Sequence, residues 1–340
     1  MGSVKDLKIV EQALENKMGI GQFRFSDRYS VFDWGEMTDH IEGKGKSLCL
    51  IGAYFFEKLE SMGMKTHYLG VVENGEVKKL AETKQAVDTM QVNLVRVLKP
   101  GEKDGSYDYS VYNDESTNML IPLEVIYRNT LPAGSSVFKR LENGSIKLAD
   151  LGLKEMPRAN DRLDKPVFDV STKLEITDRY MNWDEAKRIS NLSDSELEKI
   201  QNYTAEINGL ITEQVGKIGL TNEDGKVEFA FNHKRELMLV DVLATPDECR
   251  FNFTGIPVSK EVARIYYRKT DWFQEVENAK KQDRAGWKQL VKNPPPPLPK
   301  EFLQLISYLY QSFCNEITER RWFDAPPLKE ILSGIKMYIG

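Results

Sequence analysis

The sequence predicts an α+β protein with a β-rich front and a helical rear. Residues 7–33 alternate apolar and polar side chains around a polar turn, which predicts two short strands. Residues 183–216, and the residues that follow the proline run at 292–299, have apolar side chains at helical spacing instead. Strands therefore come first, followed by mixed strands and long helices.

The first half of the chain continues this pattern. Residues 43–63 open on Gly-Lys-Gly and read as an apolar-rich helix that ends at Gly63. Residues 65–73 and 90–98 are predicted to be further strands. The polar, glycine-containing residues 99–118 predict a loop or hairpin inserted between strands.

The middle of the chain predicts a buried strand and a hairpin. The compact apolar run at 120–129 suits a buried strand. Residues 226–231 and 236–244 are two apolar runs separated by the polar residues 232–235, which favours an antiparallel hairpin.

The helical rear has its own start signals. Asn182 precedes one helical pattern, and Ser193 with Glu196 three residues later forms a capping box for the next. Residues 292–299 (KNPPPPLP) predict a polyproline spacer before the terminal helix, which is expected to pack back on the body.

Composition excludes several classes of partner. The 340 residues include 47 basic and 52 acidic side chains, mixed along the chain with a net charge of −5, so nucleic acid is not expected as a partner. No stretch of about 18 apolar residues occurs, so no membrane span is expected. The three cysteines are far apart and fit a reducing cytoplasm. A homo-oligomer and a monomer both remain open.

Residues 128–141 (RNTLPAGSSVFKRL) suit a phosphate group. Arg128 and Ser135 belong to a cationic, hydroxyl-rich segment around a Pro-Ala-Gly turn. A second cation, Arg250, follows Asp241 by nine residues in LVDVLATPDECRF.

Glu228 and Asp241 are predicted to lie on adjacent antiparallel strands. Two carboxylates that meet across a hairpin can hold Mg²⁺ while nucleotide phosphates supply the other oxygens. A charged strand residue more often simply faces water. Asp241, however, stands among Leu239, Val240 and Val242, where an idle charge is unfavourable.

Two further motifs are weak when taken alone. Residues 26–33 (SDRYSVFD) predict either a turn or a cleft edge formed by Ser30 and Asp33. Lys44, in the Gly-Lys-Gly start of the first helix, predicts either a flexible helix start or an anion contact.

Residues 171–175 (STKLE) also allow two interpretations. The simpler one is a solvated loop. The other is a mobile loop that closes over a substrate and brings Lys173 to a phosphate.

In this order, the segments resemble the SAICAR synthetase family over most of residues 20–323. That resemblance implies a two-lobed, kinase-like or ATP-grasp-like fold with ATP between the lobes. It implies a β-rich N-terminal lobe at 1–121 and a larger mixed lobe at 122–340. The matching motifs are SDRYSVFD, GKG with its helix, PLEVIYRNTLPAGSSVFKRL, STKLE, KVEFAF and LVDVLATPDECRF.

The resemblance also implies roles for the charged residues. Arg128, Ser135 and Arg250 would bind a ribonucleotide, mainly through its phosphate. Glu228 and Asp241 would hold Mg²⁺ on the phosphates of ATP.

The remaining implied roles concern the cleft. Lys226 would lie beside the metal ligands on the ATP side. Ser30, Asp33 and Lys44 would line the cleft where substrate and aspartate meet, and Lys173 would belong to a mobile closing loop.

The implied activity is that of an ATP- and Mg²⁺-dependent ligase. It would join a carboxyaminoimidazole ribonucleotide to L-aspartate through an acyl phosphate, in de novo purine biosynthesis. The chain lacks the family's N-terminal GKAK-like turn, for which Lys17 is a poorly spaced substitute, and has Val242 where the family has an acid. These departures favour one alternative, a non-catalytic paralogue that binds a purine-precursor ribonucleotide. A small-molecule kinase is a third, weaker alternative, because the related fold supports both chemistries.

Overall fold

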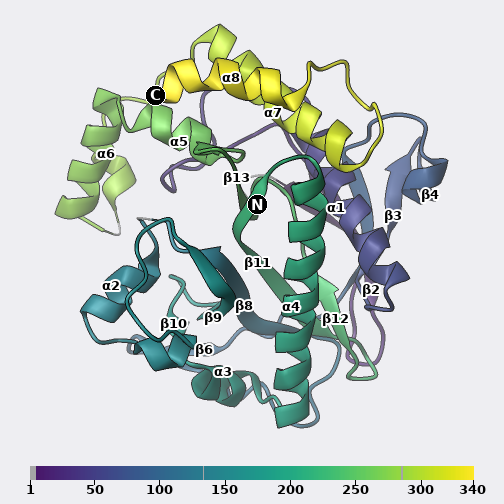
Figure 1. Ribbon diagram of the computed structural model, residues 1–340. Coiled ribbons are helices and arrows are strands. Elements are labelled where there is room, and N and C mark those ends of the chain that lie inside the picture. The colour runs from purple at the N-terminus through teal and green to yellow at the C-terminus, as the bar shows by residue number, and fades with distance from the viewer. Residues whose placement is uncertain (1–4, 133, 285) are drawn as a thin grey trace.

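A computed structural model describes residues 5–132, 134–284 and 286–340 (Figure 1). Ala133, in the predicted Pro-Ala-Gly turn, lies outside these residues. Two large antiparallel sheets, a small two-stranded sheet and a set of helices make up the described part of the molecule, so the α+β class is confirmed.

The first sheet has five strands in the order β1-β2-β5-β3-β4. All four predicted strands of the front are present. The strands are β1 (Lys5–Glu11), β2 (Gly19–Phe25), β3 (Tyr68–Glu73), β4 (Glu76–Lys78) and β5 (Thr89–Leu94). Helix α1 (Lys44–Ser61) packs against this sheet and is followed by Gly63 in the left-handed conformation (φ 89°), as predicted.

The second sheet has seven strands in the order β10-β9-β8-β11-β13-β14, with β12 also pairing with β11. The predicted hairpin of 226–231 and 236–244 is confirmed as the antiparallel pair β11 and β12. The strands are β8 (Met119–Thr130), β9 (Arg162–Thr172), β10 (Tyr180–Met181), β11 (Thr221–Phe231), β12 (Leu237–Val240), β13 (Cys249–Phe253) and β14 (Ile256–Pro257).

Helices α3 (Trp183–Ser190) and α4 (Asp194–Lys217) start where the sequence predicts. The Asn182 side chain accepts a hydrogen bond from the backbone of Glu185, and Ser193 and Glu196 form the reciprocal capping box. The helices are α2 (Ser136–Glu142), α3 (Trp183–Ser190), α4 (Asp194–Lys217), α5 (Glu261–Tyr267), α6 (Asp271–Gln282), α7 (Lys300–Ile317) and α8 (Leu328–Ile339). Short 3₁₀ turns lie at Leu80–Glu82, Leu148–Leu151 and Trp287–Gln289.

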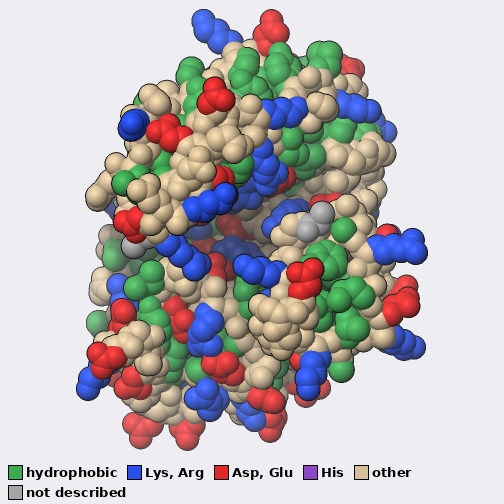
Figure 2. Space-filling view, turned by 90° about the vertical axis from the view of Figure 1, so that its left-hand side faces the viewer, with side chains coloured by type: hydrophobic (Ala, Val, Ile, Leu, Met, Phe, Trp, Pro, Cys, Tyr) green, Lys and Arg blue, Asp and Glu red, His purple; other side chains and the backbone are tan. Residues whose placement is uncertain are grey.

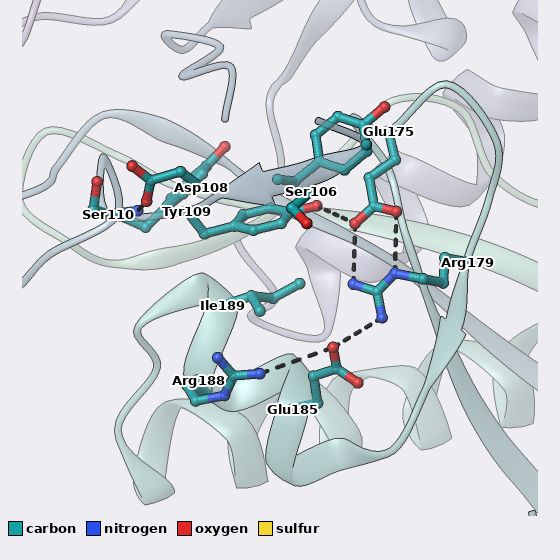
Figure 3. A pocket seen from close by; sticks show the side chains of 12 residues that line it. Ser106, Asp108, Tyr109, Ser110, Glu175, Arg179, Glu185, Arg188 and Ile189 are labelled. Atoms are coloured by element: carbon teal, nitrogen blue, oxygen red, sulfur yellow. Dashed lines mark hydrogen bonds and ion pairs between the residues drawn. The ribbon is translucent and has the colours of Figure 1, made fainter. Parts of the chain in front are cut away.

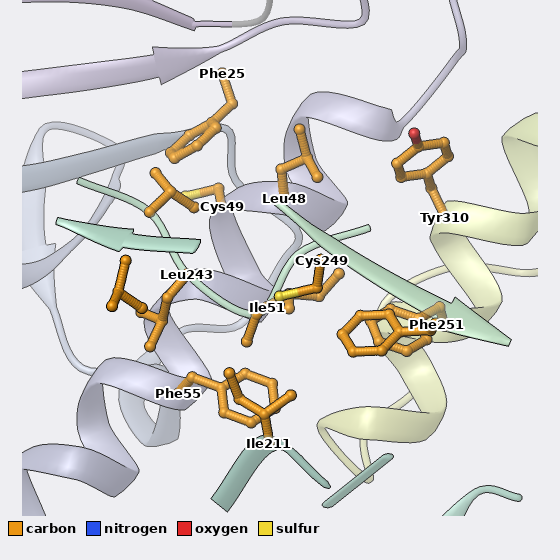
Figure 4. Packing of buried hydrophobic residues seen from close by; sticks show 14 of the residues in the cluster. Phe25, Leu48, Cys49, Ile51, Phe55, Ile211, Leu243, Cys249, Phe251 and Tyr310 are labelled. Atoms are coloured by element: carbon orange, nitrogen blue, oxygen red, sulfur yellow. The ribbon is translucent and has the colours of Figure 1, made fainter. Parts of the chain in front are cut away.

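Helix α1 lies at the centre of the apolar core (Figure 4). Its side chains pack with residues of the first sheet, of the second sheet and of the rear helices. Figure 4 labels Leu48, Cys49, Ile51 and Phe55 of α1, and around them Phe25, Ile211, Leu243, Cys249, Phe251 and Tyr310. Helix α7, which follows the proline run and precedes α8, contacts both α1 and α8, so this segment packs back on the body as expected. The division into lobes at 121/122 stays a prediction.

The segment predicted as an insertion, 99–118, contains a hairpin at residues 101–108. Strands β6 (Gly101–Lys103) and β7 (Ser106–Asp108) pair antiparallel around Asp104 and Gly105. Both turn residues have positive φ (52° and 75°), the geometry that favours Asp-Gly in a two-residue turn.

The solvated-loop interpretation of residues 171–175 is wrong at its start. Ser171 and Thr172 end β9 and are buried, because β9 pairs with β8 as far as Thr172. Among the helices within the described residues, none is long and apolar enough to cross a bilayer.

Candidate active site

Two carboxylates meet on the central strands of the second sheet. Glu124 on β8 and Glu228 on β11 are cross-strand partners, and Ser171 on β9 is the next residue across. Lys173 follows β9 directly. Its Nζ donates to Glu228 Oε1 (2.7 Å) and to Glu124 Oε1 (3.0 Å). The sheet register therefore sets two acids and a lysine at one point.

Asp241 joins this group from the end of β12. Val240 pairs with Glu228 across the β11–β12 hairpin, and Asp241 comes next. Burial and the neighbouring charge of Asp241 raise the pKa of Glu228. Burial works to raise the pKa of Asp241 as well, but the ion pair with Lys5 outweighs it and holds that pKa low. Glu228 and Asp241 thus lie near each other at the β11–β12 hairpin and face the same cavity.

Glu228 and Asp241 line a cavity of about 630 Å³ between the two sheets. Lys5 and Lys173 share its charged end. The rest of its wall is largely apolar, formed by Leu7, Ile9, Ala13, Phe23, Leu94, Val95, Val97, Leu120 and Val240. An apolar wall beside paired acids and lysines suits a ligand with a flat base and an anionic tail that carries a cation.

The lysine that reaches the acids from the N-terminus is Lys5, which the sequence analysis missed. Lys17, considered there as a substitute, instead pairs with Glu11 on the surface. Lys5, Leu7 and Ile9 are spaced two residues apart on β1, so they share one face, and all three line the cavity. This two-residue spacing was the sequence signal that could have placed Lys5 at the cavity.

The backbone of Asp241 is left-handed (φ 62°), an unusual conformation for a residue other than glycine. His67 supports it: the ring Nε2 donates to the Asp241 carbonyl (2.9 Å). The imidazole is buried between the rings of Phe23 and Phe56, and burial lowers its pKa to about 4. His67 is therefore neutral near pH 7.

His67 makes stability pH-dependent in acid. The unfolded chain protonates this histidine near its ordinary pKa of about 6.5, whereas the folded chain does not until about pH 4. The unfolded state binds the extra proton in that window, so stability falls as pH falls through it, by about 3 kcal/mol in total. Denaturant unfolding of wild type and His67→Gln at pH 7 and pH 4 measures this difference. The exposed His40→Gln change is the control, and equal acid sensitivity of wild type and His67→Gln would contradict the assignment.

A second cavity, of about 470 Å³, contains the arginines. Arg128 on β8 and Arg250 on β13 both reach Asp224 of β11, with Nη1 to Oδ2 distances of 3.6 and 2.6 Å. The β11 register brings them together, since Asp224 pairs with both Arg128 and Arg250. The sequence-predicted arginines therefore lie on the same side of the molecule.

Three arginines share two carboxylates at this end of the sheet: Arg128, Arg140 and Arg250 pair with Asp169 and Asp224. Asp169 accepts hydrogen bonds from both Arg128 and Arg140. The buried Nε atoms of these two arginines have no hydrogen-bond acceptor among the described residues. Figure 2 shows that this side of the molecule is hollowed at its centre, with Lys and Arg side chains gathered around the hollow. An anionic group is the natural ligand for such a surface.

The two cavities meet at Glu248. This residue lines both. Lys226 extends between the acids there, with its Nζ 2.8 Å from Glu124, 3.6 Å from Glu228 and 3.6 Å from Glu248. Burial would lower the pKa of Lys226, but the charges of Glu248 and Glu124 raise it, so the lysine stays a cation.

Three of the sequence-predicted residues are occupied elsewhere. Ser135 caps α2 by accepting a hydrogen bond from Val137. Ser30 accepts one from the backbone of Gly35, which matches the turn interpretation. Asp33 pairs with Lys280 of α6, and its side chain is 89% exposed.

Lys44, predicted to line the cleft, is not among the residues that line either cavity. Its side chain has no exposed surface, because α1 buries it against Tyr310. Its Nζ pairs with Asp247 Oδ2 at 2.8 Å. Asp247, not Lys44, lines the second cavity.

Comparison with known proteins decides the family. The family model of SAICAR synthetase matches residues 12–282. The chain belongs to the SAICAR synthetase family. An Archaeoglobus fulgidus protein that carries the provisional name of phosphoribosylaminoimidazole-succinocarboxamide synthase is 52% identical over 336 residues, covering 99% of both chains. The Thermoplasma acidophilum synthase is 33% identical and covers 88% of this chain and 93% of its own.

Solved structures agree on the fold. The Saccharomyces cerevisiae SAICAR synthase, complexed with SAICAR, aligns with a TM-score of 0.64 at 21% identity and covers 95% of this chain and 94% of its own. A SAICAR synthetase in complex with ADP aligns at 0.55 with 22% identity, covering 88% and 99%. Family membership confirms the predicted enzyme class, a ligase of purine biosynthesis.

Proposed function

We propose that this chain joins a carboxyaminoimidazole ribonucleotide to L-aspartate at the expense of ATP, with Mg²⁺. The observation that carries the proposal is the junction of the two cavities at Glu248, beside Glu228, Asp241 and Lys173. One cavity suits ATP and the other suits the sugar phosphate, so the two reacting groups would meet at the junction.

ATP fits the cavity between the sheets. Its adenine would lie against the apolar wall, and its phosphates would point toward Lys5, Lys173 and Lys226. In the described part of the chain, three or more metal-ligating side chains do not come together. Glu228 and Asp241 would therefore supply two ligands, with phosphate oxygens and water completing the shell, as Mg²⁺ commonly requires. Bound Mg²⁺ would neutralise charge on the phosphates.

The ribonucleotide fits the second cavity, with its phosphate toward Arg128 and Arg250. Its carboxylate would take the γ-phosphate of ATP, and ADP would leave. The aspartate amine would then attack the acyl carbon, and phosphate would depart as the amine loses a proton. Lys173 and Lys226 would stabilise the transferred phosphoryl charge, since aligned cations are what such a step needs most.

A cytoplasmic location belongs to the same proposal. All three cysteines are buried free thiols, which suits a reducing compartment.

A coupled assay for ADP release tests the proposal. With ATP, Mg²⁺, the ribonucleotide and aspartate together, we expect turnover and a succinocarboxamide product. Omission of any one substrate should abolish product formation. ADP release at the same rate with and without aspartate would indicate a kinase instead. No ADP release from folded protein would contradict ligase activity.

Arg250→Ala should weaken ribonucleotide binding by about 1.5–3 kcal/mol, the contribution of a charge-assisted hydrogen bond. The Arg250 side chain is 45% exposed and Asp224 keeps Arg128, so the fold should be little affected. Calorimetric titration with the ribonucleotide measures the effect. Arg24→Ala, at a side chain 75% exposed on the first sheet, is the control. Unchanged ribonucleotide affinity in Arg250→Ala would show that the phosphate does not bind in this cavity.

A further inference from the structure

Residues 173–179, which we call the strap, form a loop between β9 and β10. Its two ends are tied together: the Thr172 backbone N donates to the Arg179 carbonyl (3.0 Å), and the Arg179 N donates to Thr172 Oγ1 (3.1 Å). Lys173 at its start lines the first cavity, and Asp178 near its end lines the second. The strap therefore presents one charged side chain to each proposed substrate.

The 99–118 segment, which contains the β6–β7 hairpin, contacts the strap through two tyrosine hydroxyls, and Figure 3 shows the contact of Tyr109 with Glu175. Tyr109 donates to Glu175 Oε1 (2.9 Å), and Tyr107 accepts from the backbone N of Ile176 (3.0 Å). The same Glu175 carboxylate receives Nε and Nη2 of Arg179 at 3.1 and 3.0 Å.

The Glu175 carboxylate is the centre of this contact. Its side chain is only 6% exposed, so the donors of Tyr109 and Arg179 take the place of water as its hydrogen-bond partners. Burial and Glu175 raise the pKa of Tyr109, which keeps the hydroxyl protonated as a donor. Arg179 also reaches Glu185 of α3 (2.8 Å), which fixes the far end of the strap to a helix.

The 99–118 segment is itself tied to the proposed nucleotide site. It leaves the body next to Val97 and returns next to Leu120, and both residues line the first cavity. Asp114 accepts a hydrogen bond from Asn191, just after α3 (2.9 Å). One segment thus connects the wall of the nucleotide cavity to the loop that carries Lys173.

We propose that the 99–118 segment sets the position of the strap for catalysis, with Tyr109 as a positioning residue that acts through Glu175 on Lys173 and Asp178. The inference rests on the proposed function, because it assigns the strap a part in that reaction. Tyr109 does not contact a substrate. It restricts the positions that the side chains of Lys173 and Asp178 can occupy.

Tyr109→Phe removes only the hydroxyl. We expect kcat to fall by about ten- to a hundredfold, the loss that misplacement of reacting groups causes. KM values for ATP and ribonucleotide should change by less than about twofold, because the binding groups outside the strap remain. Amide hydrogen exchange of residues 173–179 should become faster, while the melting temperature stays that of wild type.

Tyr112→Phe is the matched control. It removes the same hydroxyl from the same segment, but Tyr112 donates to the carbonyl of Leu98 and not to the strap. We expect wild-type kcat and wild-type exchange of the strap in this variant. Equal losses in the two variants, or a Tyr109→Phe loss accompanied by a lower melting temperature, would assign the effect to hairpin stability and overturn the proposal.

Amide hydrogen exchange tests this inference separately from the proposed function. An inactive wild type would refute the ligase reaction. Hydrogen exchange of the strap in the two variants would still show whether the Tyr109 hydroxyl holds the strap. Wild-type kcat and exchange in Tyr109→Phe would refute the positioning role while leaving the ligase intact.

Discussion

Asp241→Asn is expected to lower kcat by about a thousandfold, because the cation proposed to neutralise the reacting phosphates loses an anionic ligand. The asparagine is nearly isosteric, and it tolerates the left-handed backbone that Asp241 adopts. Lys5 then lacks its carboxylate partner, and Glu228 alone would face the cation. Ribonucleotide affinity should stay near that of wild type, because Arg128 and Arg250 lie in the other cavity.

The assay is ADP release at saturating substrates, with calorimetry of the ribonucleotide in parallel. Asp324→Asn, at a side chain 92% exposed, controls for the chemical change. Full turnover in Asp241→Asn would show that Asp241 is not a ligand of the metal ion. A parallel loss of ribonucleotide binding would show that the substitution disturbs more than the cation.

Lys44→Met is expected to lower the free energy of unfolding by about 3–5 kcal/mol, the usual cost of breaking a buried ion pair by removing one partner. Lys44 has no exposed surface, and Asp247 would lose its counter-charge. Burial works to raise the pKa of Asp247, and Lys44 with Lys260 outweighs it and keeps that pKa low. Tyr310, which donates to Asp247 Oδ1 at 2.7 Å, would be the remaining buried donor.

Denaturant unfolding measures this loss. Lys46→Met, two residues along the same helix and exposed, makes the same chemical change without a buried partner and should cost little. A Lys44→Met protein of unchanged stability that lost turnover would support the cleft-lining role predicted from the sequence. It would contradict the structural role that the ion pair indicates.

Much of the fold could be predicted because local signals and tertiary structure agree. Asn182, and Ser193 with Glu196, cap the helices they precede, and the Asp104–Gly105 turn closes the inserted hairpin. These features depend on neighbours in sequence, which a pattern can show.

The site was harder, because it depends on the sheet register. Asp241 was singled out as a charge within an apolar strand, and Glu124 in PLEVIY has the same signature yet was overlooked. Burial works to raise the pKa of Glu124, but Lys226 and Lys173 outweigh it and lower that pKa. Only the pairing of β8 with β11 shows that Glu124 and Glu228 are neighbours.

Lys44 could not be assigned from its motif. A lysine at a Gly-rich helix start usually remains in solvent, and the tertiary packing of α1 against α7 is what buries it. Lys5 and Lys173 posed the same difficulty in reverse. Nothing local indicates that Lys5 pairs with Asp241 and Lys173 with Glu228, residues far away in the chain that line one cavity.

The position of the divalent cation tests the central claim most directly. Crystals of the protein soaked with Mn²⁺ and ADP would reveal the metal by its anomalous scattering. We expect one peak between the carboxylates of Glu228 and Asp241, with the diphosphate toward Lys173 and the adenine against Ile9 and Val95. A metal elsewhere, or a nucleotide bound in the Arg128–Arg250 cavity, would contradict the account.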